Sequence, residues 1–443
     1  MWGDNGSATG QARGGARAVQ LTARQSSMSG LPVVVRALVF LAILHAAPLY
    51  AQTAETQRTD PDPSVGAMFR NGTLAWTPAL VFSFGHDTNV YREAIGFGDY
   101  ETFTVPQMEA WWVQPGFAVR MVGAFEAVRF GGHVGGNNNQ VGIGFKRRQS
   151  IIRPYLNYNR RRTNANPTGF EVGYKSLRVE NDFSGGVRAV VSPRSEFSFV
   201  GRLTRTRWDA DAIYQTSDLR EKLNRDTRLV GAGYSYAVTP LTSVGGRVEI
   251  AHDRFQFSPL RDGDTVRLWS QVDFAKPAVI FGSAAIGHER FSSSASGAAD
   301  FNGLVATASI GYGTPDGTLI KVLVNRESEY SFDTSLAYYV MTSENVTVSR
   351  RVGRVWDLAG FVNRYMLDYR PAGLQRSADR SDTVFEYGAA VARRAGRWAR
   401  IGVTVEHAEK RAADPFESLR VVGFLTYGSG RFQRLDRPTP FER

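Results

Sequence analysis

Apolar and polar residues alternate between residues 73 and 427, in runs of roughly 10 to 14 residues divided by turn residues. Near the middle of the chain, Val266 and Leu268 share one parity, whereas Arg267 and Gln271 share the other. A repeat of two residues places one set of side chains on each face of a β-strand. No convincing stretch keeps the 3.6-residue apolar period of a helix, so the pattern predicts an all-β chain.

The connections between these runs fall into two length classes that alternate along the chain. Short ones carry Pro, Gly or charge, as in RRVGR near 352 and RRAGR near 395. Long ones are polar and include 210–224 and 327–336. About eight short turns alternating with about nine long loops predict a single closed antiparallel up-and-down barrel of about 18 strands, with 16 as the alternative. We expect the short turns to lie in the periplasm and the long loops outside the cell.

The two parities predict a transmembrane wall, with apolar side chains toward lipid and polar ones toward a wet lumen. A cation that faced lipid at mid-depth would cost about 2–4 kcal/mol, which constrains the assignment strongly. Several tryptophans toward strand ends, Trp76, Trp111, Trp112, Trp208 and Trp356, are typical of interfacial aromatic girdles. The alternative is that they form the core of a soluble sheet.

The N-terminal region has the pattern of an export signal. Arg36 precedes a short apolar run, Ala37–Ala47, and the sequence Leu49-Tyr50-Ala51 offers a cleavage site. This run is about half the roughly 20 residues of a membrane-spanning helix. We therefore predict an N-terminal extension and signal peptide over 1–51, with Met28 as the favoured start. A flexible periplasmic lead-in over 52–72, the barrel over 73–427 and a C-terminal tail over 428–443 follow.

Composition supports export and argues against several other functions. The chain has no Cys, which excludes a disulfide framework and thiolate metal sites. Mean hydropathy is −0.27, too polar for a helical membrane protein. The formal charge is +11, but its arginines are spread along the chain without a basic run or recognition helix, so we expect no nucleic-acid partner. The expected location is the outer membrane of a Gram-negative cell, with membrane lipid and the barrel-assembly machinery as partners.

Two stretches resemble a known family. The residues SFGHDTNVYRE at 83–93 and DLREKLNRDTRLVGAGYSYAV from 218 onward are similar to segments of outer-membrane β-barrel porins linked to exopolysaccharide production. The resemblance covers about 70–427 and implies passage or secretion of polysaccharide, without catalysis. Many such barrels end on an aromatic residue in the last strand, whereas Tyr427 is followed here by a 428–443 tail.

Cations at the polar parity are the candidate site. They are Arg120, Arg153, Arg188, Arg202, Arg247, Arg267, Lys321 and Arg400. Rings of cations in a pore favour anions. The more conservative interpretation, which we favour, is that they pair with lumen carboxylates such as Glu249, Asp273 and Glu406 and brace the wall. Residual positive charge in the lumen is then still expected.

Three functions compete. The first is a porin-like conduit for polysaccharide or anionic solutes, and the second is a non-conducting structural or surface-binding barrel, which loops folded into the lumen would favour. The third and weakest is an outer-membrane hydrolase. No His lies in a metal-binding spacing such as HExxH, and the chain has no GxSxG motif for a serine nucleophile, so we predict no enzyme, metal or cofactor. The sequence leaves the oligomeric state open.

Overall fold

A computed structural model describes residues 66–428, apart from 133–134, 149, 166–175, 215–216, 276–277, 295–299, 334–335, 372–379 and 413. The predicted signal segment 1–51, most of the lead-in and nearly all of the C-terminal tail lie outside the described residues. Within them, no helix is both long and apolar enough to cross a membrane.

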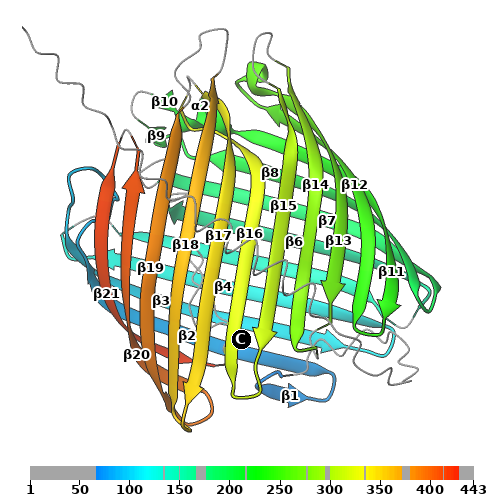
Figure 1. Ribbon diagram of the computed structural model, residues 1–443, viewed down its shortest axis with the longest axis horizontal. Coiled ribbons are helices and arrows are strands. Elements are labelled where there is room, and N and C mark those ends of the chain that lie inside the picture. Colours follow the sequence, from blue (N-terminus) through cyan, green and yellow to red (C-terminus); the bar gives the residue numbers. More distant parts are fainter. Residues whose placement is uncertain are drawn as a thin grey trace, which may run out of the picture. The chain divides into compact units, whose positions relative to one another are not determined.

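Eighteen strands close into one antiparallel barrel, in chain order and with each strand paired to its sequence neighbours (Figure 1). They are β2 (Leu74–Asp87), β3 (Asp99–Val113), β4 (Phe117–Phe130), β5 (Gly136–Arg147), β6 (Ile152–Ala165), β7 (Ser176–Ser192), β8 (Ser195–Trp208), β11 (Arg225–Thr239), β12 (Thr242–Phe255), β13 (Gly263–Phe274), β14 (Ile280–Ser293), β15 (Phe301–Gly313), β16 (Thr318–Tyr330), β17 (Leu336–Val352), β18 (Trp356–Pro371), β19 (Ser381–Ala395), β20 (Ala399–Arg411) and β21 (Phe416–Tyr427). The predicted architecture is therefore confirmed, with the larger of the two strand numbers.

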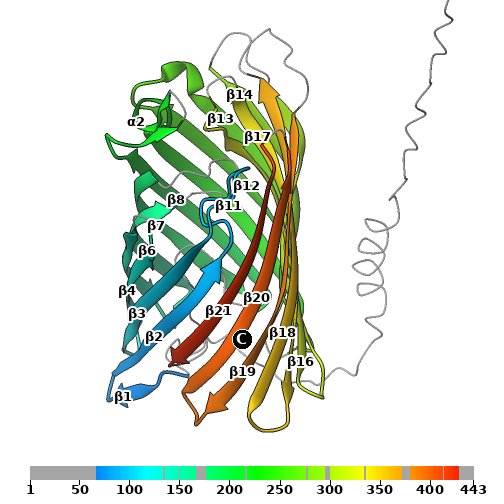
Figure 2. The ribbon, with the colours of Figure 1, turned by 90° about the vertical axis from the view of Figure 1, so that its left-hand side faces the viewer.

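The barrel closes where the first long strand meets the last. β2 pairs with β21 from Leu80↔Tyr427 to Asp87↔Arg420, and Figure 2 shows the two strands side by side. The final strand, Phe416–Tyr427, thus ends at the residue where the predicted barrel 73–427 also ends. At the short-turn end, a three-residue strand β1 (Phe69–Asn71) adds to β2.

Short turns join the strands at one end of the barrel. Gly353 and Gly396 sit in the two RRxGR turns with φ of +61° and +71°. Side chains with a Cβ rarely adopt this left-handed conformation, so these turns require glycine. At the other end, the connection after β8 contains β9 (Ile213–Tyr214), β10 (Ser217–Asp218) and a short helix α2 (Leu219–Leu223). The 210–224 loop is thus more structured than its polar composition predicts.

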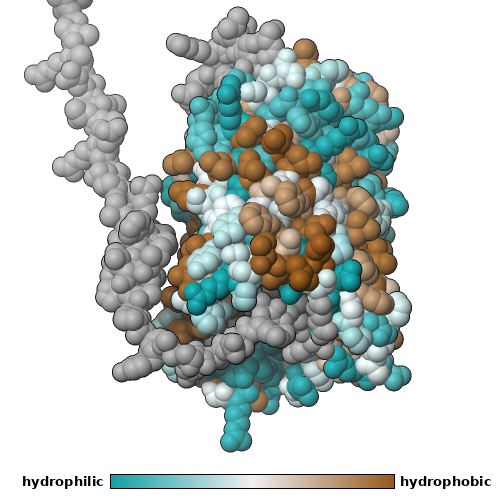
Figure 3. Space-filling view, turned by 90° about the vertical axis from the view of Figure 1, so that its right-hand side faces the viewer, coloured by the Kyte–Doolittle hydropathy of each residue, from teal (hydrophilic) through white to brown (hydrophobic). Residues whose placement is uncertain are grey.

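An apolar belt encircles the outside of the wall. Its side chains are exposed although they are large and hydrophobic; examples are Phe82, Ile143, Val248, Leu268 and Val403. Figure 3 shows the belt in brown, with hydrophilic residues in teal beyond it toward both ends. A closed sheet has no unpaired edge, which is the condition for spanning lipid with strands. The wall is therefore that of an outer-membrane barrel.

The tryptophans divide between the two faces. Trp112 and Trp356 are outward, near the short turns, with 42% and 44% of their surface exposed, as a girdle requires. Trp208 is 5% exposed and packs inside the barrel mouth, and Trp111 shares the inward parity of Glu109. The girdle prediction was wrong for these last two, because strand parity sets which face a residue occupies.

Candidate functional site

The eight candidate cations all lie on the face of the sheet opposite the exposed apolar belt. Five of them have a carboxylate partner within 4 Å. These pairs are Arg120–Glu109 (2.7 Å), Arg202–Asp182, Arg247–Glu249 (3.0 Å), Arg267–Glu289 (2.5 Å) and Arg400–Asp357 (3.2 Å). Each pair joins residues of the same or a neighbouring strand, apart from the pair between β20 and β18, so these cations brace the wall.

The other three cations have different surroundings. Arg153 donates from Nε to the carbonyl oxygen of Ser150 at 2.8 Å. Arg188, its register partner on β7, lies 5.8 Å over the ring of Tyr155. Lys321 has the inward parity of β16 and lies opposite Gly311 and Thr347 in the sheet.

Carboxylates are abundant on the same inward parity of the described strands. They include Glu101, Glu109, Glu126, Glu180, Asp182, Glu249, Asp253, Asp273, Glu289, Asp357, Asp382, Glu386 and Glu406. They offset the inward cations rather than leaving these in excess. The expected residual positive charge on the lumen wall therefore has no support in the described strands.

In the half of the inner wall formed by β3–β8, part of the surface is accessible to water, although Glu126 and Asn138, nearer the long loops, are buried. The side chains of Arg120 and Arg202 point inward, yet 50% and 54% of their surface is exposed. Amide and aromatic groups lie between them: Gln140 donates to Asn159 at 3.0 Å, and Arg120 lies 5.6 Å over Trp111. A packed core would bury such groups, so this wall lines an aqueous space.

The other half is covered by the chain itself. The pairing of β15 with β16 ends at Ala306↔Arg326, although β16 continues to Tyr330 and β15 begins at Phe301. Beyond Arg326 the β16–β17 hairpin leaves the wall. We call the segment 327–340, with 334–335 undescribed, the hairpin tip.

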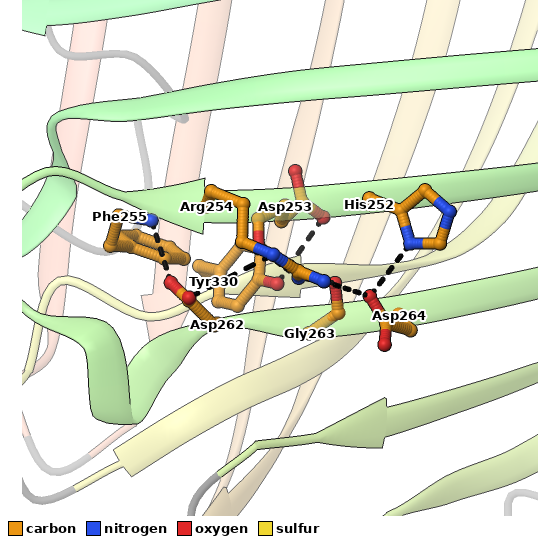
Figure 4. A network of polar contacts seen from close by, with 8 residues as sticks. All are labelled: His252, Asp253, Arg254, Phe255, Asp262, Gly263, Asp264 and Tyr330. Carbon is orange, nitrogen blue, oxygen red and sulfur yellow. Dashed lines mark hydrogen bonds and ion pairs between the residues drawn. The ribbon is translucent and has the colours of Figure 1, made fainter.

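The contacts of the hairpin tip lie on the inner face of the barrel. Ser328 donates to Glu289 of β14, and the Tyr330 hydroxyl donates to Asp253 of β12 at 3.2 Å (Figure 4). The Tyr330 ring packs edge-on against Phe255 at 4.8 Å. Since all three wall residues have the inward parity, the tip folds into the barrel mouth.

Further contacts fix the end of the tip. Phe332 packs edge-on against Trp208 of β8, with ring centroids 5.5 Å apart, and shares a buried cluster with Leu219 and Leu223 of α2. Arg261, from the loop after β12, donates to the carbonyl oxygens of Ser331 and Ala337 at 2.5 and 3.3 Å. The sequence prediction that 327–336 is an external loop was therefore wrong.

A second cluster shows how deep the tip is buried. Tyr338 and Val340, which are 2% and 1% exposed, pack with Trp269, Phe291 and Val305 of the wall. Beneath this layer Glu289 is fully buried and accepts from both Arg267 and Ser328. The tip thus converts this part of the inner wall into a packed core.

A network of charged residues that the sequence analysis missed lies where β2 pairs with β21 and the barrel closes. Arg420 of β21 is 6% exposed and pairs with Glu101 of β3 and Glu406 of β20, the latter at 2.8 Å. Strand β2 lies between β21 and β3, and its Gly85 has no room for a Cβ, which would lie 2.3 Å from the carbonyl oxygen of Val421. Only the closed register reveals this contact, because Glu101 and Arg420 are distant in sequence.

The described histidines of the wall, His86, His252, His288 and His407, share the parity of the outward belt. His252 contacts Asp264 at 2.8 Å, and His407 lies 3.8 Å from Glu417. Within the described residues, no group of three or more acidic or histidine side chains is placed to hold a metal ion.

Comparisons with known proteins concern the fold. No family model and no curated protein sequence matches the chain. Similar solved structures include the outer membrane protein opdK from Pseudomonas aeruginosa (12% identity, 80% of this chain and 99% of that one, TM-score 0.44) and a BenF-like porin from Pseudomonas fluorescens Pf-5 (11%, 80% and 98%, 0.45). A bacterial polysaccharide outer membrane secretin also matches (12%, 81% and 98%, 0.33). The chain is thus similar to outer-membrane barrels, and its resemblance to exopolysaccharide-linked porins stays a prediction.

Proposed function

We propose that the protein is a porin-like conduit of the outer membrane that passes hydroxyl-rich polar solutes, such as saccharides, along the inner face of β3–β8. The observation that carries this proposal is the water-accessible inner wall, where inward-facing Arg120 and Arg202 remain about half exposed. A barrel of 18 strands measures about 35 Å across, from strand spacing and tilt. One hairpin packed on the wall occupies about 10 Å of that width.

The chemistry of the open wall supports a saccharide rather than an ion. Asn157, Asn159 and Gln140 offer amide donors and acceptors to hydroxyl groups, beside the rings of Tyr155 and Trp111, over which Arg188 and Arg120 lie. Binding sites of this kind combine apolar surface with a few well-placed polar groups. Because the inward cations are matched by carboxylates, we expect weak selectivity between anions and cations.

Liposome swelling tests the conduit directly. Vesicles that contain the full barrel should swell in neutral oligosaccharides and, more slowly, in oligosaccharides that carry uronic acids. An N157A/N159A variant, which removes two amides and no charge, should weaken oligosaccharide block of single-channel current while leaving conductance in salt nearly unchanged. Absence of both swelling and conductance would contradict the conduit, and unchanged block in the variant would contradict the saccharide site.

A non-conducting, surface-binding barrel is the second candidate, and the hairpin tip favours it. If the tip, together with loops at the same end, closes the lumen, the wild type will not conduct, but a variant with 328–338 replaced by a short Gly-containing turn will. If the tip only narrows the lumen, both proteins will conduct and the variant will carry the larger current. In that second case, whether the protein passes exopolysaccharide would be decided by which solutes permeate it.

A further inference from the structure

A band of arginines lies on the outer face of the barrel, where a lipid-facing wall is not expected to carry charge. Its members have the parity of the apolar belt and lie toward the long-loop ends of β6, β8, β11, β12 and β14. They are Arg160, Arg162, Arg205, Arg207, Arg228, Arg254 and Arg290. We call these residues the outer arginine band.

The band begins where the apolar belt ends. On β6 the outward residues Leu156 and Tyr158 precede Arg160, and on β12 Val248 and Ile250 precede His252 and Arg254. A cation on the lipid face costs about 2–4 kcal/mol at mid-depth but about 0–1 kcal/mol near the interface. The band therefore lies at the level of the lipid headgroups on the long-loop side.

Strand pairing places the members of the band on β8, β11 and β12 next to one another. Arg205 lies opposite Asp226, which lies opposite Arg254, and Arg228 lies opposite His252. Adjacent strands are about 4.8 Å apart, so the three strand steps from Arg228 to Arg290 span about 14 Å. That is the width of a lipid headgroup rather than of a single ion.

The acidic residues within the band neutralise only part of it. Asp226 pairs with Arg207 at 2.5 Å, and Asp264 pairs with Arg254 at 2.9 Å and with His252 (Figure 4). In the described part of the chain, no carboxylate lies within ion-pair distance of Arg228 or Arg290. Arg160 and Arg162, three strands from the nearer of these aspartates, are likewise without a carboxylate partner among described residues.

The opposite side of the same rim is built differently. There Arg364 of β18 lies 3.7 Å from Glu344, and Arg411 of β20 lies 2.8 Å from Glu409. These four side chains also have the outward parity, so charges of both signs balance on that side. Excess positive charge is therefore a local property of the β6–β14 sector.

We propose that the outer arginine band binds the phosphate groups of lipids in the leaflet at the long-loop side. Arginine forms bidentate hydrogen bonds with phosphate, and each basic residue near an anionic membrane surface strengthens binding. A soluble phosphate fits the site less well, because the apolar belt directly below the band is placed to contact acyl chains of the same molecule. This role is independent of what passes through the lumen.

Native mass spectrometry of the full barrel in detergent tests the proposal, with a bisphosphorylated glucosamine lipid (lipid A) as the probe. R228Q/R290Q should bind lipid A roughly 10- to 30-fold more weakly than the wild type. The matched control R364Q/R411Q loses the same charge from the balanced sector and should change binding less than about twofold. Heat-modifiable migration checks that each variant is folded.

Two further arms separate the lipid from free phosphate. Dephosphorylated lipid A should bind weakly to the wild type and equally weakly to R228Q/R290Q, and inorganic phosphate should not displace lipid A at equal phosphate concentration. Equal weakening by both double variants, equal binding of the dephosphorylated lipid, or displacement by inorganic phosphate would each overturn the proposal.

Discussion

Two ion pairs of the same kind lie on the inner face of the barrel, in opposite surroundings. In the β3–β8 half, Arg202 pairs with Asp182 and remains 54% exposed. In the β11–β15 half, Arg267 pairs with Glu289, with exposures of 22% and 0%. The wall is the same sheet in both places, so strand parity does not account for the difference. The hairpin tip does, because Ser328, Tyr338 and Val340 cover only the second pair.

The comparison shows that one chain segment divides the lumen into a water-accessible wall and a packed one. Charges on the accessible wall are screened and available to solutes. Charges beneath the tip are removed from water and serve packing. The same residue types therefore have different roles on the two walls.

The largest expected effect comes from breaking the covered pair. Arg267→Gln leaves the buried Glu289 without its cation and should lower the free energy of unfolding by about 3–5 kcal/mol. Urea titration of the reconstituted barrel measures this. R267Q/E289Q should recover part of the loss, and a loss below about 1 kcal/mol in the single variant would show that the tip does not bury this pair.

A smaller effect is expected from loosening the tip itself. Tyr330→Phe removes the hydroxyl that donates to Asp253 and should cost about 1.5–3 kcal/mol of local stability. Hydrogen exchange of residues 327–333 should become faster, with little change in β3–β8. Tyr158→Phe, which removes a hydroxyl bonded to Asn181 on the outward face, is the control and should leave exchange of the tip unaltered.

Breaking the accessible pair should cost little stability but change permeation. Arg202→Gln should lower the free energy of unfolding by about 0–1 kcal/mol. Loss of the Arg202 charge from the water-accessible wall should shift the reversal potential in a salt gradient toward cation preference. The same potential in R267Q should match the wild type. A shift of equal size in both variants would mean that both walls contact the permeating ions.

Sequence reasoning reached the strands because a two-residue period and turn residues are local signals. It missed the hairpin tip for a physical reason. Ser328, Tyr330, Tyr338 and Val340 keep the parity of the lipid belt, and an apolar face has the same pattern whether it packs on lipid or on the inner wall. The tip leaves the wall where β15 pairing stops, at Arg326, which is a tertiary event.

The candidate cations illustrate the same limit. Parity placed them on one face, but their partners, such as Asp182 for Arg202 and Asp357 for Arg400, depend on register and barrel closure. The outer arginine band was likewise visible only once the belt was located on each strand. Composition gives the formal net charge of the whole chain, +11, without saying which face of the barrel carries the excess.

The smallest expected effect concerns a short turn outside both walls, between β15 and β16. A hydrogen bond from the Thr314 hydroxyl, with help from the backbone N–H of Thr318, lowers the pKa of Asp316 in a short turn. A carboxyl with a lower pKa in the folded state stabilises it above the unfolded pKa and loses that contribution as the pH falls. Asp316→Asn should therefore flatten the pH dependence of unfolding slightly between about pH 5 and pH 3. A variant that keeps the full wild-type slope would contradict this assignment.

Thiol accessibility tests the division of the lumen most directly, because the chain has no Cys. Asn157→Cys places a thiol on the accessible wall, and Val305→Cys places one beneath the hairpin tip, where the native side chain is fully buried. With a charged, membrane-impermeant maleimide, the barrel in vesicles should react rapidly at position 157. At position 305 it should react only after 328–338 is replaced by a short turn. Rapid labelling at both positions in the otherwise intact barrel would contradict the account.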